Sequence, residues 1–237
     1  DETTFASHTV RRTTPLREYL YVAHMQAGSL PDRRADGSGG RSGWVLDDFV
    51  RHDRAREASL IREEVVCLRL YTGPMHVIYN HVMRQGLKRA YVTTLHALNS
   101  GVWKLSQHSR ACTVYRALSG GSLPTQLSTP GPKGTIGGVE ASFTSVSSDR
   151  LVALEHARTR RVDSQTRSSL MLHIKVGVRD RAADVEFLSQ SPSERELIFA
   201  PLTALEVVSK PWIEGTTIVI DVRLWSQPTG YTIEQLT

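Results

Sequence analysis

The sequence predicts an α+β protein, because segments with helical periodicity come first along the chain and segments with strand periodicity follow. Residues 91–105 repeat apolar side chains every three or four positions, as a helix with one buried face does. After His108 the period changes, and residues 170–176 alternate apolar and polar side chains as a strand does. Helices followed by strands favour a helical part and a mostly antiparallel sheet system.

The composition is that of an ordinary globular protein with room for one generous domain. The chain has 237 residues, of which 40% are hydrophobic and 22% are charged. Lys and Arg exceed Asp and Glu by 29 − 24 = 5, which suits an anionic partner. Because the sequence contains no long Lys/Arg block, a nucleic-acid partner is not expected. No apolar run reaches the roughly 18 residues of a membrane span, so no membrane segment is expected.

The two cysteines bear on the compartment. Cys67 and Cys112 both lie in apolar sequence, so we expect buried free thiols rather than a disulfide. Free thiols favour a reducing compartment such as the cytoplasm, and the start of this segment does not resemble a secretion signal.

Two parts of the chain differ in composition. Residues 1–43 are predicted to form an N-terminal extension, with one short element at 17–23 and a flexible linker rich in Gly, Ser and Arg. Residues 44–237 are predicted to form the folded domain, with helices at about 45–107 and a β-rich core at about 110–237.

The helices expected in the first half have identifiable ends. An ordered helical region starts at 44–50, and Ser59 is predicted to be the N-cap of the next helix. That helix should stop at Thr72-Gly73-Pro74, because Gly and Pro together end helices. Further helices are expected at 75–84 and 91–105.

In the second half, the predicted strands are separated by loops and one helix. Asp149 is expected to be the N-cap of a helix at 151–157, and a basic polar loop should follow at 158–167. A Pro/Gly-rich loop is expected at 124–138. The predicted strands are 111–118, 141–146, 170–176, a strand that contains Glu194-Arg195-Glu196, 204–209 and 216–224.

The Glu-Arg-Glu segment is unusual for a strand. Alternation would place Glu194 and Glu196 on the same face, although two like charges that close repel each other and are costly to desolvate. A solvated edge strand is the plain interpretation. Arg116 raises a similar question, because it lies within an apolar strand. It either pairs with a later carboxylate or forms a fork that holds a phosphate.

Several common site types are not supported. The histidines have no metal-binding spacing and the cysteines are too few for a zinc site, so no metal is expected. No Gly-x-Gly-x-x-Gly follows a strand, and neither a Gly-Lys-Ser/Thr loop nor a nucleophile elbow is present.

Three segments in order along the chain resemble a known signature. They are Tyr-Arg-Ala-Leu-Ser-Gly at 115–120, Phe-Thr-Ser-Val-Ser at 143–147 and Phe-Leu-Ser-Gln-Ser-Pro-Ser-Glu-Arg-Glu at 187–196. Together they resemble the R-S-E signature of the arginine-specific mono-ADP-ribosyltransferases, which share their fold with many bacterial toxins. The resemblance extends from Trp44 to the C-terminus. It implies a helical part packed on a mostly antiparallel two-sheet core with an NAD cleft.

The resemblance also implies roles for individual residues. Arg116 would bind the phosphates of the co-substrate NAD, and Ser145 would hold Glu196 in place. Glu196 would bind the nicotinamide ribose and stabilise its cationic transition state as nicotinamide leaves. Glu194 would orient the acceptor guanidinium of a protein substrate and help deprotonate it. Further NAD contacts are expected at Ala117, Ser119, Gly120 and Ser147.

The departures from the family pattern affect the choice of acceptor more than the cleavage of NAD. Ala117 stands where a glycine usually follows the motif arginine, and Val146 replaces a threonine. In the acceptor turn at 188–193, Ser191 stands where related sequences often carry an aromatic residue. Two alternatives therefore stay open: an NAD glycohydrolase that uses water as the acceptor, and a non-catalytic module that binds NAD or a protein.

Overall fold

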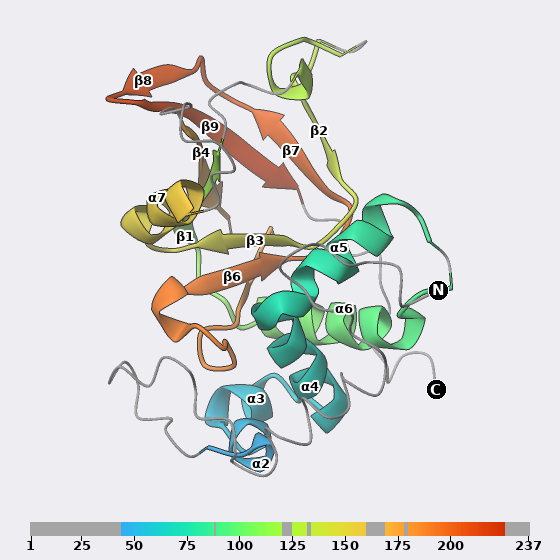
Figure 1. Ribbon diagram of the computed structural model, residues 1–237. Helices are drawn as coiled ribbons and strands as arrows, with labels where there is room; N and C mark the ends of the chain where they lie inside the picture. The colour runs from blue at the N-terminus through green and yellow to red at the C-terminus, as the bar shows by residue number, and fades with distance from the viewer. Residues whose placement is uncertain are drawn as a thin grey trace. The chain divides into compact units, whose positions relative to one another are not determined.

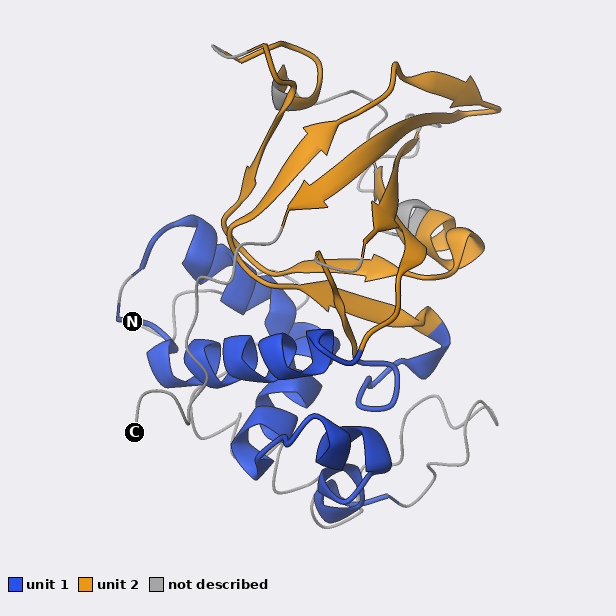
Figure 2. Cartoon of the chain, turned by 180° about the vertical axis from the view of Figure 1, so that it is seen from behind, with its two compact units in different colours: residues 1–108, 185–193, 230–237 blue, residues 109–184, 194–229 orange. Residues whose placement is uncertain are grey.

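The computed structural model separates the chain into two compact units (Figure 2). It describes residues 44–87, 89–119, 125–131, 134–159, 169–177 and 180–225. Unit 1 takes its described residues from 44–108 and 185–193, and unit 2 takes its own from 109–184 and 194–225. The predicted extension at 1–43, with its element at 17–23, lies outside the described residues.

Unit 1 contains the helices. They are α2 (Leu46–Val50), α3 (Asp53–Glu57), α4 (Arg62–Leu70), a π-helical turn η1 (Tyr71–Met75), α5 (His76–Arg84) and α6 (Val92–Ser106) (Figure 1). The helices predicted at 75–84 and 91–105 are confirmed as α5 and α6. Leu98, Val102 and Leu105 of the predicted stripe are buried, whereas Leu95 is half-buried.

The predicted N-cap of α4 is wrong. Ser59 has a left-handed backbone (φ 52°), and the helix begins three residues later at Arg62. The Glu64 carboxylate instead accepts the Ile61 N–H at 2.9 Å. Glu64 is fully buried and also accepts from Ser100 Oγ at 2.5 Å and from Lys104 Nζ at 3.0 Å, so one acid both caps α4 and ties it to α6.

The predicted stop at Thr72-Gly73-Pro74 is a kink instead. Helical structure continues through η1 into α5, with Gly73 in a non-helical conformation (φ −100°, ψ −156°). Pro74 lacks an N–H and cannot extend the hydrogen-bond ladder. The two residues interrupt the helix locally but do not end it, because α5 resumes at once.

Unit 2 contains a sheet of nine strands within the described residues. They are β1 (Cys112–Ser119), β2 (Gly137–Glu140), β3 (Thr144–Ser147), β4 (Ser169–Val176), β5 (Ala183–Asp184), β6 (Glu196–Phe199), β7 (Thr203–Val207), β8 (Trp212–Glu214) and β9 (Thr217–Trp225). The order is β2-β7-β9-β4-β1-β3-β6-β5, with β8 paired to β9. Only β4 and β9 run parallel in this set, so the mostly antiparallel prediction is confirmed.

The predicted division into two sheets is not what the hydrogen bonds show, since the strands form one continuous path. At one point along this path, two neighbouring strands are joined by a single residue pair. β1 pairs with β4 along its whole length, but it pairs with β3 only through Tyr115 and Ser147. That single pair is the only register recorded between β1 and β3 within the described residues.

The core of unit 2 lies against one face of these strands. Val114 of β1, Val146 of β3 and Phe199 of β6 meet there with alternate residues of β4 and β9. The opposite face of β1 and β4 is covered by α7 (Arg150–Thr159), whose Ala153 packs with Met171 and Val219 (Figure 1). The strand β3 thus presents Val146 to the core and its serines to the other face.

The structure also bears on the predictions made for the short strands, the basic loop, the cysteines and membrane segments. The short strand predicted at 141–146 begins only at Thr144, and β2, β5 and β8 were not predicted. Residues 158–159 belong to α7 rather than to the basic loop, of which 160–167 lie outside the described residues. Cys67 is buried and Cys112 is half-buried, and both are free. None of the helices in the described part of the chain is long and apolar enough to cross a membrane.

Candidate functional site

A serine and a glutamate on adjacent strands form the centre of the candidate site. In the β3–β6 register Ser147 lies opposite Glu196, so Ser145, Ser147 and Glu196 share one face of the sheet. Ser145 Oγ donates a hydrogen bond of 2.5 Å to Glu196 Oε1. Glu196 is only 7% exposed, so this carboxylate is desolvated and held in one orientation.

Glu194 does not lie on the strand with Glu196, which corrects the interpretation of a shared strand face. Glu194 ends a 3-10 turn at Pro192–Glu194, and β6 begins only at Glu196. Between them Arg195 has a left-handed backbone (φ 45°). A left-handed residue breaks the alternation of a strand and costs free energy in a non-glycine residue, so surrounding contacts must hold it.

Those contacts come from the segment that follows β3. Ser147 Oγ donates to the Glu194 carbonyl at 2.7 Å, and the Ser148 N–H donates to the Arg195 carbonyl at 3.1 Å. The Asp149 carboxylate lies 3.8 Å from the Arg195 guanidinium. Asp149 also accepts the Leu151 N–H at 2.9 Å, which confirms it as the N-cap of α7.

Arg116 and Ala117 lie on β1, next to β3. Tyr115 pairs with Ser147 and therefore shares the face of Ser147. Arg116 is half-buried and pairs with Leu172, so alternation directs its side chain to the other face of β1. The structure thus gathers the predicted Ser145, Ser147 and Glu196 but does not place Arg116 on their face.

Two further predicted NAD contacts fall at the end of β1 and just after it. Ser119 is the last residue of β1. Gly120 lies outside the described residues. Among the residues that the structure describes, no group of His, Cys, Asp and Glu side chains is arranged to hold a metal ion.

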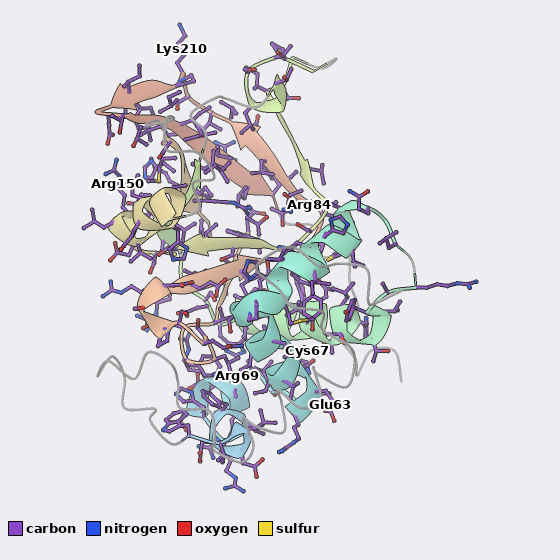
Figure 3. The ribbon with its side chains drawn as sticks, in the orientation of Figure 1. Glu63, Cys67, Arg69, Arg84, Arg150 and Lys210 are labelled. Atoms are coloured by element: carbon purple, nitrogen blue, oxygen red, sulfur yellow. The ribbon has the colours of Figure 1, made fainter. Side chains whose placement is uncertain are left out.

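The predicted acceptor turn at 188–193 belongs to unit 1, where it is bonded to the kink after α4. Arg69 Nη1 donates to the Leu188 carbonyl at 2.7 Å (Arg69 is labelled in Figure 3). Gln190 Nε2 donates to the Arg69 carbonyl at 2.6 Å, and the Gln190 N–H donates to Thr72 Oγ1 at 3.2 Å. A Cβ on Gly73 would lie 2.2 Å from Gln190 Nε2, so only glycine fits beside this side chain.

Sequence reasoning missed the residues that surround the site from other elements. His156 Nε2 of α7 lies 3.4 Å from Glu194 Oε1. The Tyr115 ring stacks on His173 (centroids 5.4 Å apart, planes at 16°), and His173 Nδ1 lies 2.6 Å from Asp221 Oδ1. Strand alternation places Tyr115 and His173 on one side of the sheet, but no pattern in the sequence indicates the contact between His156 and Glu194.

Comparisons with known proteins gave different results for the sequence and for the fold. No model of a known protein family matches the sequence, and no curated protein matches it. Solved structures do match. The ADP-ribosyltransferase HopU1 of Pseudomonas syringae pv. Tomato DC3000 superposes with a TM-score of 0.59 at 16% identity, covering 76% of this chain and 86% of HopU1.

Two other bacterial proteins of known structure also superpose on this chain. Exoenzyme S from Pseudomonas aeruginosa, solved with human 14-3-3 protein beta and Carba-NAD, has a TM-score of 0.55 at 16% identity over 91% of this chain and 96% of its own. The Vibrio splendidus toxin Vis, solved with agmatine, has a TM-score of 0.55 at 16% identity over 87% and 93%.

This chain has the ADP-ribosyltransferase fold. The match covers most of each compared chain, so the resemblance in the three short segments extends to the architecture. With an identity of 16%, the likeness concerns the fold, and the chemistry has to be argued from the side chains of this ADP-ribosyltransferase-like chain.

Proposed function

We propose that this protein is a mono-ADP-ribosyltransferase that moves ADP-ribose from NAD to arginine side chains of a protein and releases nicotinamide. The observation that carries the proposal is the hydrogen bond between Ser145 and Glu196 on adjacent strands. These are the serine and the glutamate that the signature predicts to act together, although 51 residues separate them in the chain. The fold supports the same activity.

The chemistry assigned to Glu196 follows from its burial. As the bond between the ribose C1′ and the nicotinamide nitrogen breaks, its electron pair leaves with nicotinamide and positive charge develops on the ribose. A fixed, desolvated carboxylate stabilises that charge without reorganising, as carboxylates do in glycosidases. Ser145 donates to one oxygen of Glu196 and so fixes the carboxylate in an orientation from which it accepts a hydrogen bond from a ribose hydroxyl.

Glu194 is assigned to the acceptor. A free guanidinium is always protonated in water, so its proton must leave as the new C1′–N bond forms. Glu194 receives that proton. Glu194 lies in a turn rather than on β6, so it is held by other contacts than those that hold Glu196.

The remaining contacts with NAD are assigned to β1 and β3. Arg116, whose side chain alternation directs away from the Glu196 face, is assigned to the phosphates that extend from the nicotinamide ribose, and Ala117, Ser119, Gly120 and Ser147 are assigned to the nicotinamide end. The Carba-NAD complex of Exoenzyme S supports NAD as the co-substrate, and the agmatine complex of Vis supports an acceptor with a guanidinium group. No metal takes part in this scheme.

The decisive experiment compares two substitutions with labelled NAD and agmatine as the acceptor. Glu196→Gln should lose both nicotinamide release and agmatine labelling, because the ribose cation is no longer stabilised. Glu194→Gln should lose agmatine labelling by roughly 100-fold or more while nicotinamide release continues, since only the proton acceptor is removed. Chromatography measures free nicotinamide and labelled agmatine in the same reaction.

Two results would contradict the proposal. Nicotinamide release by the unsubstituted protein, with neither agmatine nor any protein of a lysate labelled, would identify an NAD glycohydrolase instead. Calorimetric binding of NAD without nicotinamide release would identify a non-catalytic NAD-binding module.

A further inference from the structure

His156 contacts the glutamate to which the acceptor chemistry is assigned. Its Nε2 lies 3.4 Å from Glu194 Oε1, and the two side chains are 39% and 24% exposed. His156 lies in the C-terminal half of α7 (Arg150–Thr159), which also packs against β1 and β3. Arg150, at the start of the same helix, forms its ion pair with Glu214 instead (Arg150 is labelled in Figure 3).

The backbone of the Glu194 turn is already fixed by other groups. Ser147 Oγ donates to the Glu194 carbonyl, and the Ser148 N–H donates to the carbonyl of Arg195. Asp149 faces the Arg195 guanidinium. These contacts hold the main chain at 194–195, but none of them involves the Glu194 carboxylate. The orientation of that carboxylate depends on side-chain contacts, of which His156 provides one.

We propose that His156 is a positioning residue that orients the Glu194 carboxylate toward the acceptor and tunes its basicity. The proposal rests on the function proposed above and adds a residue that the signature does not contain. During transfer the acceptor nitrogen forms its bond to C1′, and its proton passes to a Glu194 oxygen. His156 exchanges no proton with the substrate; it holds the accepting carboxylate.

The charge on His156 gives this contact a pH dependence. An imidazolium stabilises the neighbouring carboxylate as an anion and so weakens it as a base, whereas a neutral imidazole only donates a hydrogen bond. Among the described residues, the charged neighbours in sequence are Arg195, which follows Glu194 and faces Asp149, and Glu155, which precedes His156 on α7 and is exposed. The ratio of agmatine transfer to NAD hydrolysis should therefore rise as the pH increases through the titration of His156.

Two substitutions and a matched control test the proposal in the full-length chain. His156→Gln keeps an N–H donor near Glu194 but cannot titrate, whereas His156→Leu removes the donor. His108→Gln is the control, because His108 is an exposed histidine in unit 1. For each protein, nicotinamide release and agmatine labelling are measured from about pH 5.5 to about pH 8.5, the range in which histidine titrates.

His156→Leu should lower the ratio of agmatine labelling to hydrolysis by about 10- to 100-fold, the order expected for losing one polar contact with a charged group. His156→Gln should keep most of the transfer at neutral pH but abolish the rise of the ratio with pH. His108→Gln should behave as the unsubstituted protein. A merely structural role for His156 would lower both reactions together and leave the pH dependence of their ratio intact.

The outcomes separate this inference from the proposed function. Transfer by the unsubstituted protein, with an unchanged ratio and pH profile in both His156 variants, would overturn the role of His156 and leave the transferase standing. An unsubstituted protein that labels neither agmatine nor any protein would overturn both, because Glu194 would have no acceptor to serve.

Discussion

At the scale of single residues, the site depends on one short hydrogen bond between neighbouring strands. Ser145 and Glu196 are far apart in the sequence, yet the β3–β6 register makes them diagonal neighbours on one face. Because Glu196 is buried, replacing Ser145 would leave a desolvated carboxylate without this hydrogen bond. That loss costs more free energy than the loss of a contact at the surface.

Replacement of Ser145 tests the value of this bond. Ser145→Ala should reduce the rate of nicotinamide release by about 10- to 100-fold, because Glu196 loses the charge-assisted bond that orients it. Ser148→Ala is the matched control on the same segment, since the Ser148 side chain is exposed and its bond to the Arg195 carbonyl comes from the backbone. Equal rates of nicotinamide release in the two variants would show that Glu196 keeps its orientation without Ser145.

At the scale of elements, the acceptor turn and the kink after α4 depend on each other. Gly73 interrupts the helix, and the space beside it is occupied by the Gln190 side chain. Gln190 Nε2 in turn donates to the Arg69 carbonyl, which also accepts from Thr72 Oγ1 of the kink. The turn therefore gains its order from a defect in a helix that is remote in the sequence.

A double-mutant cycle measures this dependence. Gly73→Ala should displace the Gln190 amide and cost about 1 kcal/mol of unfolding free energy, the net value of one hydrogen bond. The same substitution in a Gln190→Ala background should cost much less, because the space beside residue 73 is then empty. Urea denaturation gives the four free energies. Additive effects would contradict the dependence. Gly177→Ala is the control, since no atom of the described residues lies within 4 Å of the Cβ it would gain.

At the scale of the whole molecule, unit 1 is not continuous in sequence. Residues 185–193 leave the strands of unit 2 and bond to α4, where they supply Leu188, which is fully buried, and Phe187, which stacks on His52 at 4.7 Å. Burying two such side chains stabilises a fold by about 3–6 kcal/mol, a large part of the stability of a small domain.

A fragment of residues 44–108 should therefore retain helix but lose its cooperative thermal transition. Joining residues 185–193 to it by a flexible Gly/Ser linker should restore the transition, and the same fusion with Leu188→Asp should not, because a buried carboxylate is unfavourable. Far-UV circular dichroism during heating measures both. A sharp transition in the fragment alone would show that the inserted segment is dispensable for the fold.

Local patterns explain which parts of the fold and site were predictable. Helix and strand periods depend on neighbouring residues, so α5, α6, β1, β4 and β9 were found with small errors at their ends. Asp149 was recognised as an N-cap because caps are local as well. Ser59 failed as a cap because buried Glu64, which is held by α6, supplied the cap from inside the helix.

The sequence by itself determined the α+β class and the order of the signature residues, and the family resemblance implied the pairing of Ser145 with Glu196. Only the tertiary structure decided that Glu194 lies in a turn, that Arg116 pairs with Leu172 of β4 and that His156 reaches Glu194. The reason is physical. Arg195 adopts its left-handed backbone because contacts from the β3–α7 segment compensate its cost, and such compensation depends on packing between distant segments.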